Sequence, residues 1–168
     1  MTFVVPFDGS PLAQAALSRA VAFAGVTDET VVAVTVVPAG NADYARGKEW
    51  LSADESFDRG TVVDRIRGRV VDLAPDASFR VEFVDRHAPT GTLSTRIRRV
   101  LREEAATMVF VGSDNAGRVA ASVASVGHGV SGAPEYDVVI VRTPDPSPVT
   151  AVREQEPLAE RQGEGDAN

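Results

Sequence analysis

The chain has 168 residues, of which 43% are hydrophobic and 24% are charged, and its formal net charge is −7. That length suits one ordinary domain with a hydrophobic core of its own. No apolar run approaches the roughly 18 residues of a membrane span, and residues 1–3 lead into a strand-like segment without a signal leader, so we expect a cytoplasmic protein rather than a membrane or exported one. The absence of cysteine excludes disulfides, thiolate nucleophiles and cysteine-based zinc sites.

The negative charge is concentrated in residues 143–168, but residues 1–142 are also acidic on balance. A general nucleic-acid binder needs the opposite sign, so no nucleic-acid partner is expected. Large apolar residues are rare after residue 142, and a tail of that composition is expected to be disordered. The sequence therefore predicts one domain at residues 1–142 and an acidic, disordered tail at residues 143–168.

The first third of the chain alternates predicted strands and helices. Phe3–Phe7 is a short apolar run, and residues 8–11 stop it with a serine and a proline that suit the cap and first position of a helix. Small and apolar residues then recur at helical spacing as far as Gly25. Thr30–Val37 is almost continuously β-branched or apolar, which is typical of a central strand covered on both faces.

The middle of the chain begins with a polar, irregular stretch at residues 38–56, which predicts a long loop. A helix ending before Pro75 is predicted next from a stripe of four apolar residues: Val62, Ile66, Val70 and Leu73. Phe79–Val84 alternates apolar and polar residues, which predicts an edge strand with one wet face.

The remaining elements continue the alternation. A helix is predicted at Pro89–Ala106, an apolar strand at Met108–Gly112, a helix broken by glycines at residues 116–132, and a last strand at Asp137–Arg142. This order predicts a single doubly wound α/β domain with helices on both faces of a parallel sheet. Ligands of such sheets bind beyond the carboxyl ends of the strands where the winding reverses, so the loops at residues 6–10 and 112–118 are the candidates.

Several of these pieces together resemble the universal stress protein family. The resemblance covers about residues 2–142. It lies in a first strand that ends in a Val-Pro-x-Asp-Gly-Ser motif at residues 5–10, an Ala/Leu-rich first helix, a fourth strand closing on residues 111–113, and an Ala-Pro pair at 133–134. It implies a five-stranded sheet in the order 3-2-1-4-5 and a homodimer.

In one branch of that family, the resemblance implies ATP bound between the first and fourth strand ends. Adenine and ribose would meet Asp8 and the backbone near Val36, and the phosphates would lie on the loop that starts at Gly112. Mg²⁺ is expected only together with ATP. The residues predicted to hold the nucleotide are Pro6, Asp8, Val36, Gly112, Asp114, Asn115, Arg118 and Ser125.

The loop departs from the Gly-x2-Gly-x9-Gly-Ser/Thr pattern of that branch. Asn115 stands at the second glycine and Ser125 or Ala124 at the third. Asn tolerates a positive φ better than most residues, and Ser125 and Arg118 can offer a hydroxyl and a guanidinium to a phosphate. Two functions therefore stay open: adenine-nucleotide binding without fast turnover, and a nucleotide-free homodimeric interaction module in which the loop is a relic.

Other features of the sequence favour structural roles. Asp8 can bond a ribose, and it is expected to cap the following turn in either case. No nucleophile and base can be paired, so no catalytic residue is predicted. Trp50 is predicted to anchor the loop after the second strand to the core rather than to cover a base. Four consecutive apolar residues in Asp137–Arg142 would leave a sticky edge, which predicts a homodimer through that strand, with an unknown protein partner also possible.

Overall fold

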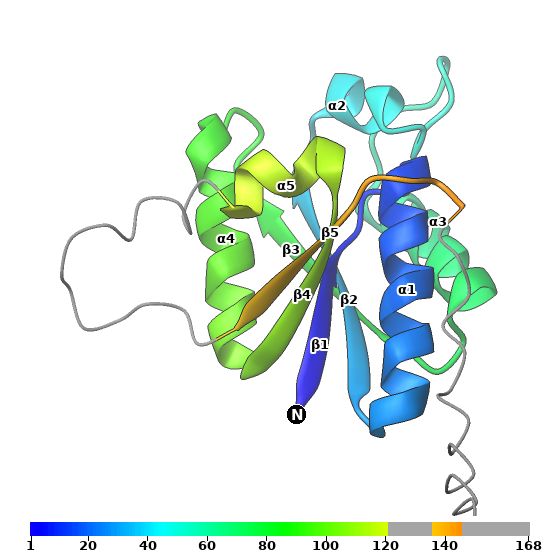
Figure 1. The fold of residues 1–168 in the computed structure, drawn as a ribbon. Coiled ribbons are helices and arrows are strands. Elements are labelled where there is room, and N and C mark those ends of the chain that lie inside the picture. The colour runs from blue at the N-terminus through cyan, green and yellow to red at the C-terminus, as the bar shows by residue number, and fades with distance from the viewer. Residues whose placement is uncertain (121–135, 146–168) are drawn as a thin grey trace, which may run out of the picture.

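The computed structural model describes residues 1–120 and 136–145, and it contains a five-stranded parallel sheet in the order β3-β2-β1-β4-β5 (Figure 1). The fold class and strand order predicted from the sequence are thus confirmed. The strands are β1 (Thr2–Pro6), β2 (Thr30–Pro38), β3 (Ser78–Val84), β4 (Ala106–Gly112) and β5 (Asp137–Val141). The winding reverses between β1 and β4, which pair with each other in the middle of the sheet.

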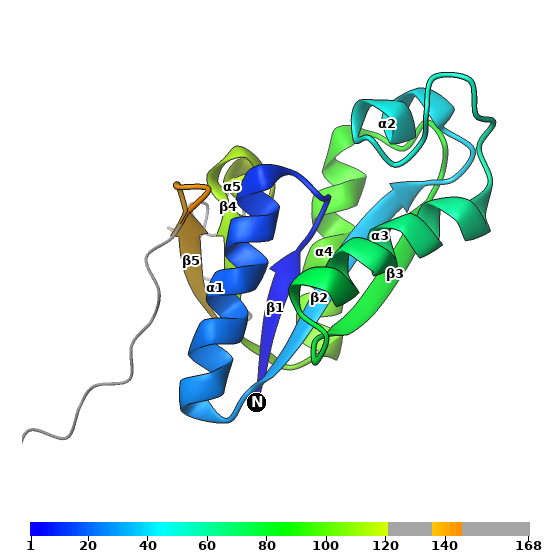
Figure 2. The ribbon, with the colours of Figure 1, turned by 90° about the vertical axis from the view of Figure 1, so that its right-hand side faces the viewer.

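Helices cover both faces of the sheet (Figures 1 and 2). They are α1 (Pro11–Thr27), α2 (Ala42–Gly47), α3 (Arg59–Leu73), α4 (Thr90–Glu103) and α5 (Ser113–Ala120). One buried cluster joins the sheet to α1 and α3, and a second joins the opposite face to α4 and the start of α5. None of the helices in the described part of the chain has the length and apolar character that a membrane crossing requires.

The start of α1 is fixed by the residues that the sequence indicated. The side chain of Ser10 accepts a hydrogen bond from the backbone N–H of Ala13 at 3.3 Å, and Pro11 takes the first helical position. The buried face of α1 is made of small residues and Leu17, so the helix lies close to the sheet. This close approach sets the geometry of the loop that precedes α1.

The region between β2 and α3 differs from its prediction as a long loop. It contains the short helix α2, which begins where the side chain of Asn41 accepts a hydrogen bond from the N–H of Tyr44 at 3.0 Å. The prediction missed it because α2 buries only Ala45 and so has no apolar stripe. Leu73 was also misplaced: it stands at the last turn of α3 and is partly exposed.

The prediction of a helix after the fourth strand holds only in part. Helix α5 begins at Ser113, three residues before the predicted start at residue 116. Its early start follows from the sheet, because β4 passes directly into the helix without a loop. Residues 121–132 of the predicted helix, and the tail beyond residue 145, lie outside the described part of the chain.

The prediction of β3 as an edge strand is confirmed, but its polar face is only partly exposed, because ion pairs cover much of it. Arg80 is hydrogen-bonded to Glu82 on its own strand and to Glu103 and Glu104 at the end of α4. On the other face, the guanidinium of Arg59 lies 4.6 Å from the ring centroid of Phe83. Long arginine side chains therefore cover β3, the outer strand of the sheet, and leave neither face freely wet.

Candidate functional site

The candidate site lies at the carboxyl ends of the central strands, where β1 leads into the loop before α1 and β4 leads directly into α5. The prediction of a loop at residues 112–118 is therefore wrong, because α5 begins at Ser113. The two segments still meet, because the side-chain amide of Asn115 donates a hydrogen bond to the carboxylate of Asp8 at 3.1 Å. Figure 1 shows α2, α5 and the start of α1 at this same end of the sheet. The two segments that the sequence singled out therefore converge.

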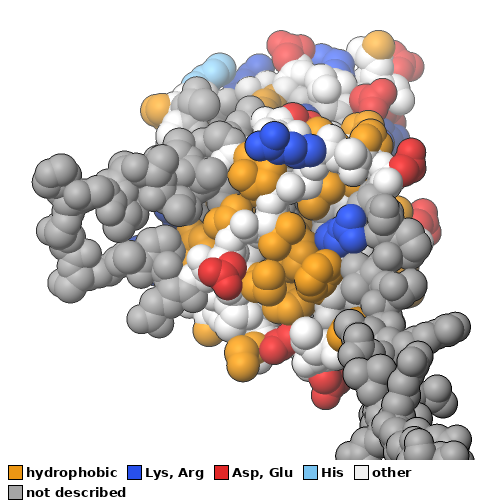
Figure 3. All heavy atoms as spheres, in the orientation of Figure 1, with side chains coloured by type: hydrophobic (Ala, Val, Ile, Leu, Met, Phe, Trp, Pro, Cys, Tyr) orange, Lys and Arg blue, Asp and Glu red, His pale blue; other side chains and the backbone are white. Residues whose placement is uncertain are grey.

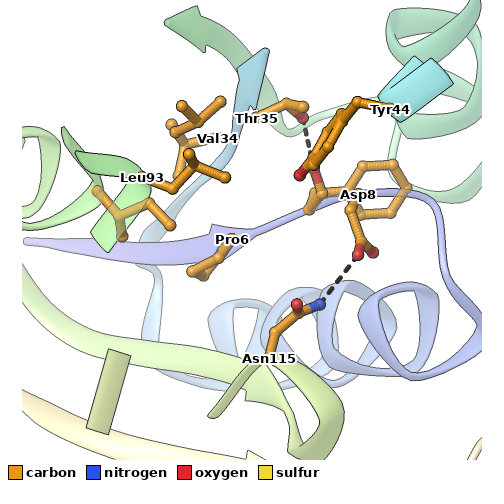
Figure 4. A pocket seen from close by; sticks show the side chains of 10 residues that line it. Pro6, Asp8, Val34, Thr35, Tyr44, Leu93 and Asn115 are labelled. Carbon is orange, nitrogen blue, oxygen red and sulfur yellow. Dashed lines mark hydrogen bonds between the residues drawn. The ribbon is translucent and has the colours of Figure 1, made fainter. Parts of the chain in front are cut away.

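A small cleft with a cavity volume of about 40 Å³ opens at this point (Figure 4). Its walls are mostly apolar and come from the ends of β1 and β2 and from three helices. The residues that line it are Pro6, Phe7, Asp8, Val34, Thr35, Val36, Tyr44, Leu93, Ile97 and Asn115. A concave, largely apolar site with a few polar groups is the usual form of a small-molecule site.

Asp8 is the polar centre of the cleft. Its carboxylate accepts hydrogen bonds from the N–H of Ser10 at 3.0 Å, from Nζ of Lys48 at 2.7 Å and from Nδ2 of Asn115 at 3.1 Å. Burial by itself raises the pKa of Asp8, but the bonds from Lys48, Ser10 and Asn115 outweigh burial and lower the pKa to about 2. Asp8 is therefore a fixed, ionised acceptor near neutral pH.

The predicted capping role of Asp8 is confirmed by its bond to the N–H of Ser10. The next residue, Pro11, has no N–H to cap. Gly9, between Asp8 and Ser10, has a φ of 82°, in the left-handed region that glycine adopts at little cost. A Cβ there would lie 2.6 Å from Nη1 of Arg69, so Gly9 also makes room for that side chain.

The segment after α2, which contains Trp50, is hydrogen-bonded to the backbone of the site. The indole N–H of Trp50 donates to the carbonyl oxygen of Asp8 at 2.9 Å, and the Trp50 side chain is fully buried. Its prediction as an anchor is thus confirmed. Arg65 and Arg69 of α3 hold this segment from behind, because they donate to the carbonyl oxygens of Trp50 and Glu49.

The buried hydroxyl of Thr35 holds the carbonyl group of Phe7, the residue before Asp8. Thr35 of β2 is the one buried polar residue found in the described part of the chain, and its Oγ1 donates to the carbonyl oxygen of Phe7 at 2.5 Å. Figure 4 shows this bond and the Asn115–Asp8 bond on two sides of the cleft. The end of β1 is therefore held from β2, from the segment after α2 and from α5.

The predicted site residues separate into three groups. Pro6, Asp8, Val36 and Asn115 line the cleft. Asp114 is exposed in the first turn of α5, and Gly112 is buried at the end of β4, where a Cβ would lie 2.8 Å from Cβ of Leu12. The side chain of Arg118, in α5, and all of Ser125 lie outside the described part of the chain.

Several residues of the site were not predicted. Lys48 is bonded to Asp8, and six others line the cleft: Phe7, Val34, Thr35, Tyr44, Leu93 and Ile97. Leu93 and Ile97 were recognisable as the inward face of a helix, but not as the wall of a ligand site. Lys48 carried one signal, as the single lysine beside 16 arginines. Nothing in the local sequence showed that a residue 40 positions away would reach Asp8.

Residues 1–142 match the model of the universal stress protein family. The chain belongs to the universal stress protein family. The match confirms the resemblance drawn from the ordered set of sequence motifs. No curated protein matches the chain.

Solved structures of universal stress proteins share the fold. UspA from Lactobacillus plantarum is 18% identical, with a TM-score of 0.52, and the match covers 84% of this chain and 97% of that one. The protein from Archaeoglobus fulgidus in complex with dAMP is 15% identical, with a TM-score of 0.50, and covers 84% and 95%. At these identities the likeness establishes the architecture alone.

Proposed function

We propose that this universal stress protein is cytoplasmic and binds an adenine nucleotide in the Asp8 cleft. It acts through the bound nucleotide and does not hydrolyse it rapidly. The observation that carries the proposal is the cleft itself: an apolar-walled hollow at the reversal point of the sheet, with an ionised carboxylate fixed at one end. The Archaeoglobus fulgidus relative was solved with dAMP, which supports a ligand of this class.

The walls of the cleft suit a purine base. Pro6 and Val36 come from strand ends, Leu93 and Ile97 from α4, and the ring of Tyr44 from α2. Tyr44 packs against Trp50, with ring centroids 5.7 Å apart, so its orientation is supported from behind. A flat apolar base gains stability from such surroundings by leaving water and by contact with an aromatic ring.

Asp8 suits a ribose. A carboxylate offers about four positions for hydrogen-bond donors, and three at Asp8 are used within the protein. Release of Asn115 would leave two positions for the two neighbouring hydroxyls of a ribose. Asn115 would then be free to turn its amide toward another part of the ligand.

The start of α5 suits a phosphate. Helix N-termini present unpaired backbone N–H groups and favour negative charge. Gly112, Asp114 and Asn115 occupy the turn where β4 enters α5. Arg118 and Ser125 would supply a guanidinium and a hydroxyl, and Mg²⁺ would accompany a triphosphate.

Isothermal titration calorimetry tests this function directly. ATP with Mg²⁺, and AMP alone, are titrated into the full chain, and thermal unfolding is followed in parallel. We expect measurable heat and a rise in Tm for the wild type. Asp8→Ala should weaken binding by about tenfold or more, because a charge-assisted hydrogen bond is lost. Asp64→Ala removes an exposed carboxylate from α3 and should change nothing. No heat and no shift at millimolar nucleotide would refute the proposal.

The edge strand β5 supports a second candidate, the homodimeric interaction module. Figure 3 shows hydrophobic side chains gathered over β5 and beside α1, and Ile140 is 41% exposed. The opposite edge, β3, is instead covered by arginines and ion pairs. Charged edges resist pairing and apolar edges favour it, so we place the contact with a second copy at β5.

Sedimentation velocity tests the dimer. We expect the wild type to sediment as a dimer and Ile140→Asp as a monomer, because the new charge would be buried in the interface. Val71→Asp, on the exposed face of α3, is the matched control and should stay dimeric. A monomeric wild type would rule the dimer out. If Asp8→Ala preserves function in cells while Ile140→Asp abolishes it, the interaction module is the correct function.

A further inference from the structure

The ammonium group of Lys48 lies at the rim of the cleft, although Lys48 is not among the residues that line it. Its Nζ is 2.7 Å from Oδ2 of Asp8 and 5.9 Å from the ring centroid of Tyr44, and both of these residues do line the cleft. The Lys48 side chain keeps 24% of its exposure. An ammonium has three N–H donors, and within the described part of the chain the bond to Asp8 is the one that Lys48 makes.

Lys48 also sets the net charge at the polar centre of the cleft. Among the described residues that line the cleft, Asp8 is the charged one, and its carboxylate is ionised. A phosphorylated ligand next to Asp8 alone would be repelled. With Lys48 paired to it, the centre is neutral and still offers free N–H groups. Other charges near the site include Arg69, beside Gly9, and Asp114, in the first turn of α5.

We propose that Lys48 is a specificity-determining residue that makes the cleft prefer phosphorylated adenine nucleotides over the bare nucleoside. The inference rests on the proposed function, because it assumes that the base and ribose occupy the Asp8 cleft. Because the ammonium of Lys48 is paired with the carboxylate that would hold the ribose, the phosphate of a bound nucleotide would meet a neutral ion pair instead of a bare negative charge. The role does not require Lys48 to leave Asp8.

The test compares adenosine with AMP, which differ by the phosphate. For the wild type we expect AMP to bind about tenfold more tightly than adenosine at low salt, and the ratio to shrink as salt rises, because screening weakens charge attraction. This measurement needs no variant. Lys48→Gln, which keeps an N–H donor but removes the charge, should lower AMP affinity about tenfold and adenosine affinity about threefold at most. Lys48→Arg should restore the preference for AMP.

The control is Arg67→Gln, which removes one positive charge from the exposed surface of α3 and should leave the AMP-to-adenosine ratio unchanged. Equal affinity for adenosine and AMP in the wild type would overturn the role of Lys48 while leaving the proposed function intact. A preference for AMP that survives in Lys48→Gln would place the phosphate on other groups and would also overturn it. If neither compound binds, the proposed function fails and the role of Lys48 fails with it.

Discussion

Replacing Trp50 with alanine is expected to lower the free energy of unfolding by about 3–5 kcal/mol. The side chain is fully buried and is the largest in the core. It packs against Tyr44 and donates its indole N–H to the carbonyl oxygen of Asp8. Alanine would leave a cavity, free the segment after α2, and leave a carbonyl of the site without its donor.

Urea unfolding followed by far-UV circular dichroism measures this effect, since the chain has no second tryptophan to report by fluorescence. Trp50→Phe separates the two contributions, because it keeps most of the ring volume and removes the N–H. We expect it to cost about 1–3 kcal/mol, the range for an unsatisfied polar group plus a smaller cavity. A loss below about 1 kcal/mol for Trp50→Ala would show that Trp50 does not anchor the fold.

Gly112→Ala is expected to destabilise the protein by about 1–3 kcal/mol, the usual cost of overpacking. An added Cβ would lie 2.8 Å from Cβ of Leu12 and 2.9 Å from the backbone carbonyl carbon of the same residue. Backbone at the start of α1 cannot move aside as a flexible side chain can. The glycine is therefore required for packing between β4 and α1, whatever it contributes to a phosphate.

Gly68→Ala is the matched control for Gly112→Ala. Gly68 lies inside α3, and nothing lies within 4 Å of an added Cβ. Alanine should stabilise the helix there by about 0.5–1 kcal/mol. Thermal unfolding of the two variants should therefore shift Tm in opposite directions, and a neutral Gly112→Ala would show that α1 can retreat from β4.

The fold was largely predictable from the sequence because its signals are local. The apolar run of β2 and the capped start of α1 each sit within a few residues. The family resemblance then supplied the strand order, which local signals do not determine. α2 escaped prediction because so short a helix with one buried residue leaves no periodic trace.

The site was predictable in place but not in detail. The position of Asp8 at a strand end indicated where a ligand site would form. Two of the three partners of its carboxylate come from 40 and 107 residues away, so they depend on the completed fold. Asn115 was weighed as a replacement for a glycine in a turn, whereas in the structure its side chain joins the start of α5 to Asp8.

The way in which Asp8 is held has a mechanical consequence. Its carboxylate and its carbonyl oxygen together receive donors from the α1 loop, the end of α2, the buried indole and the first turn of α5. Because these segments all bind the same residue, a displacement of one of them changes the hydrogen bonds of the others. A ligand that replaces a single donor at Asp8 would therefore affect segments on both sides of the centre of the sheet.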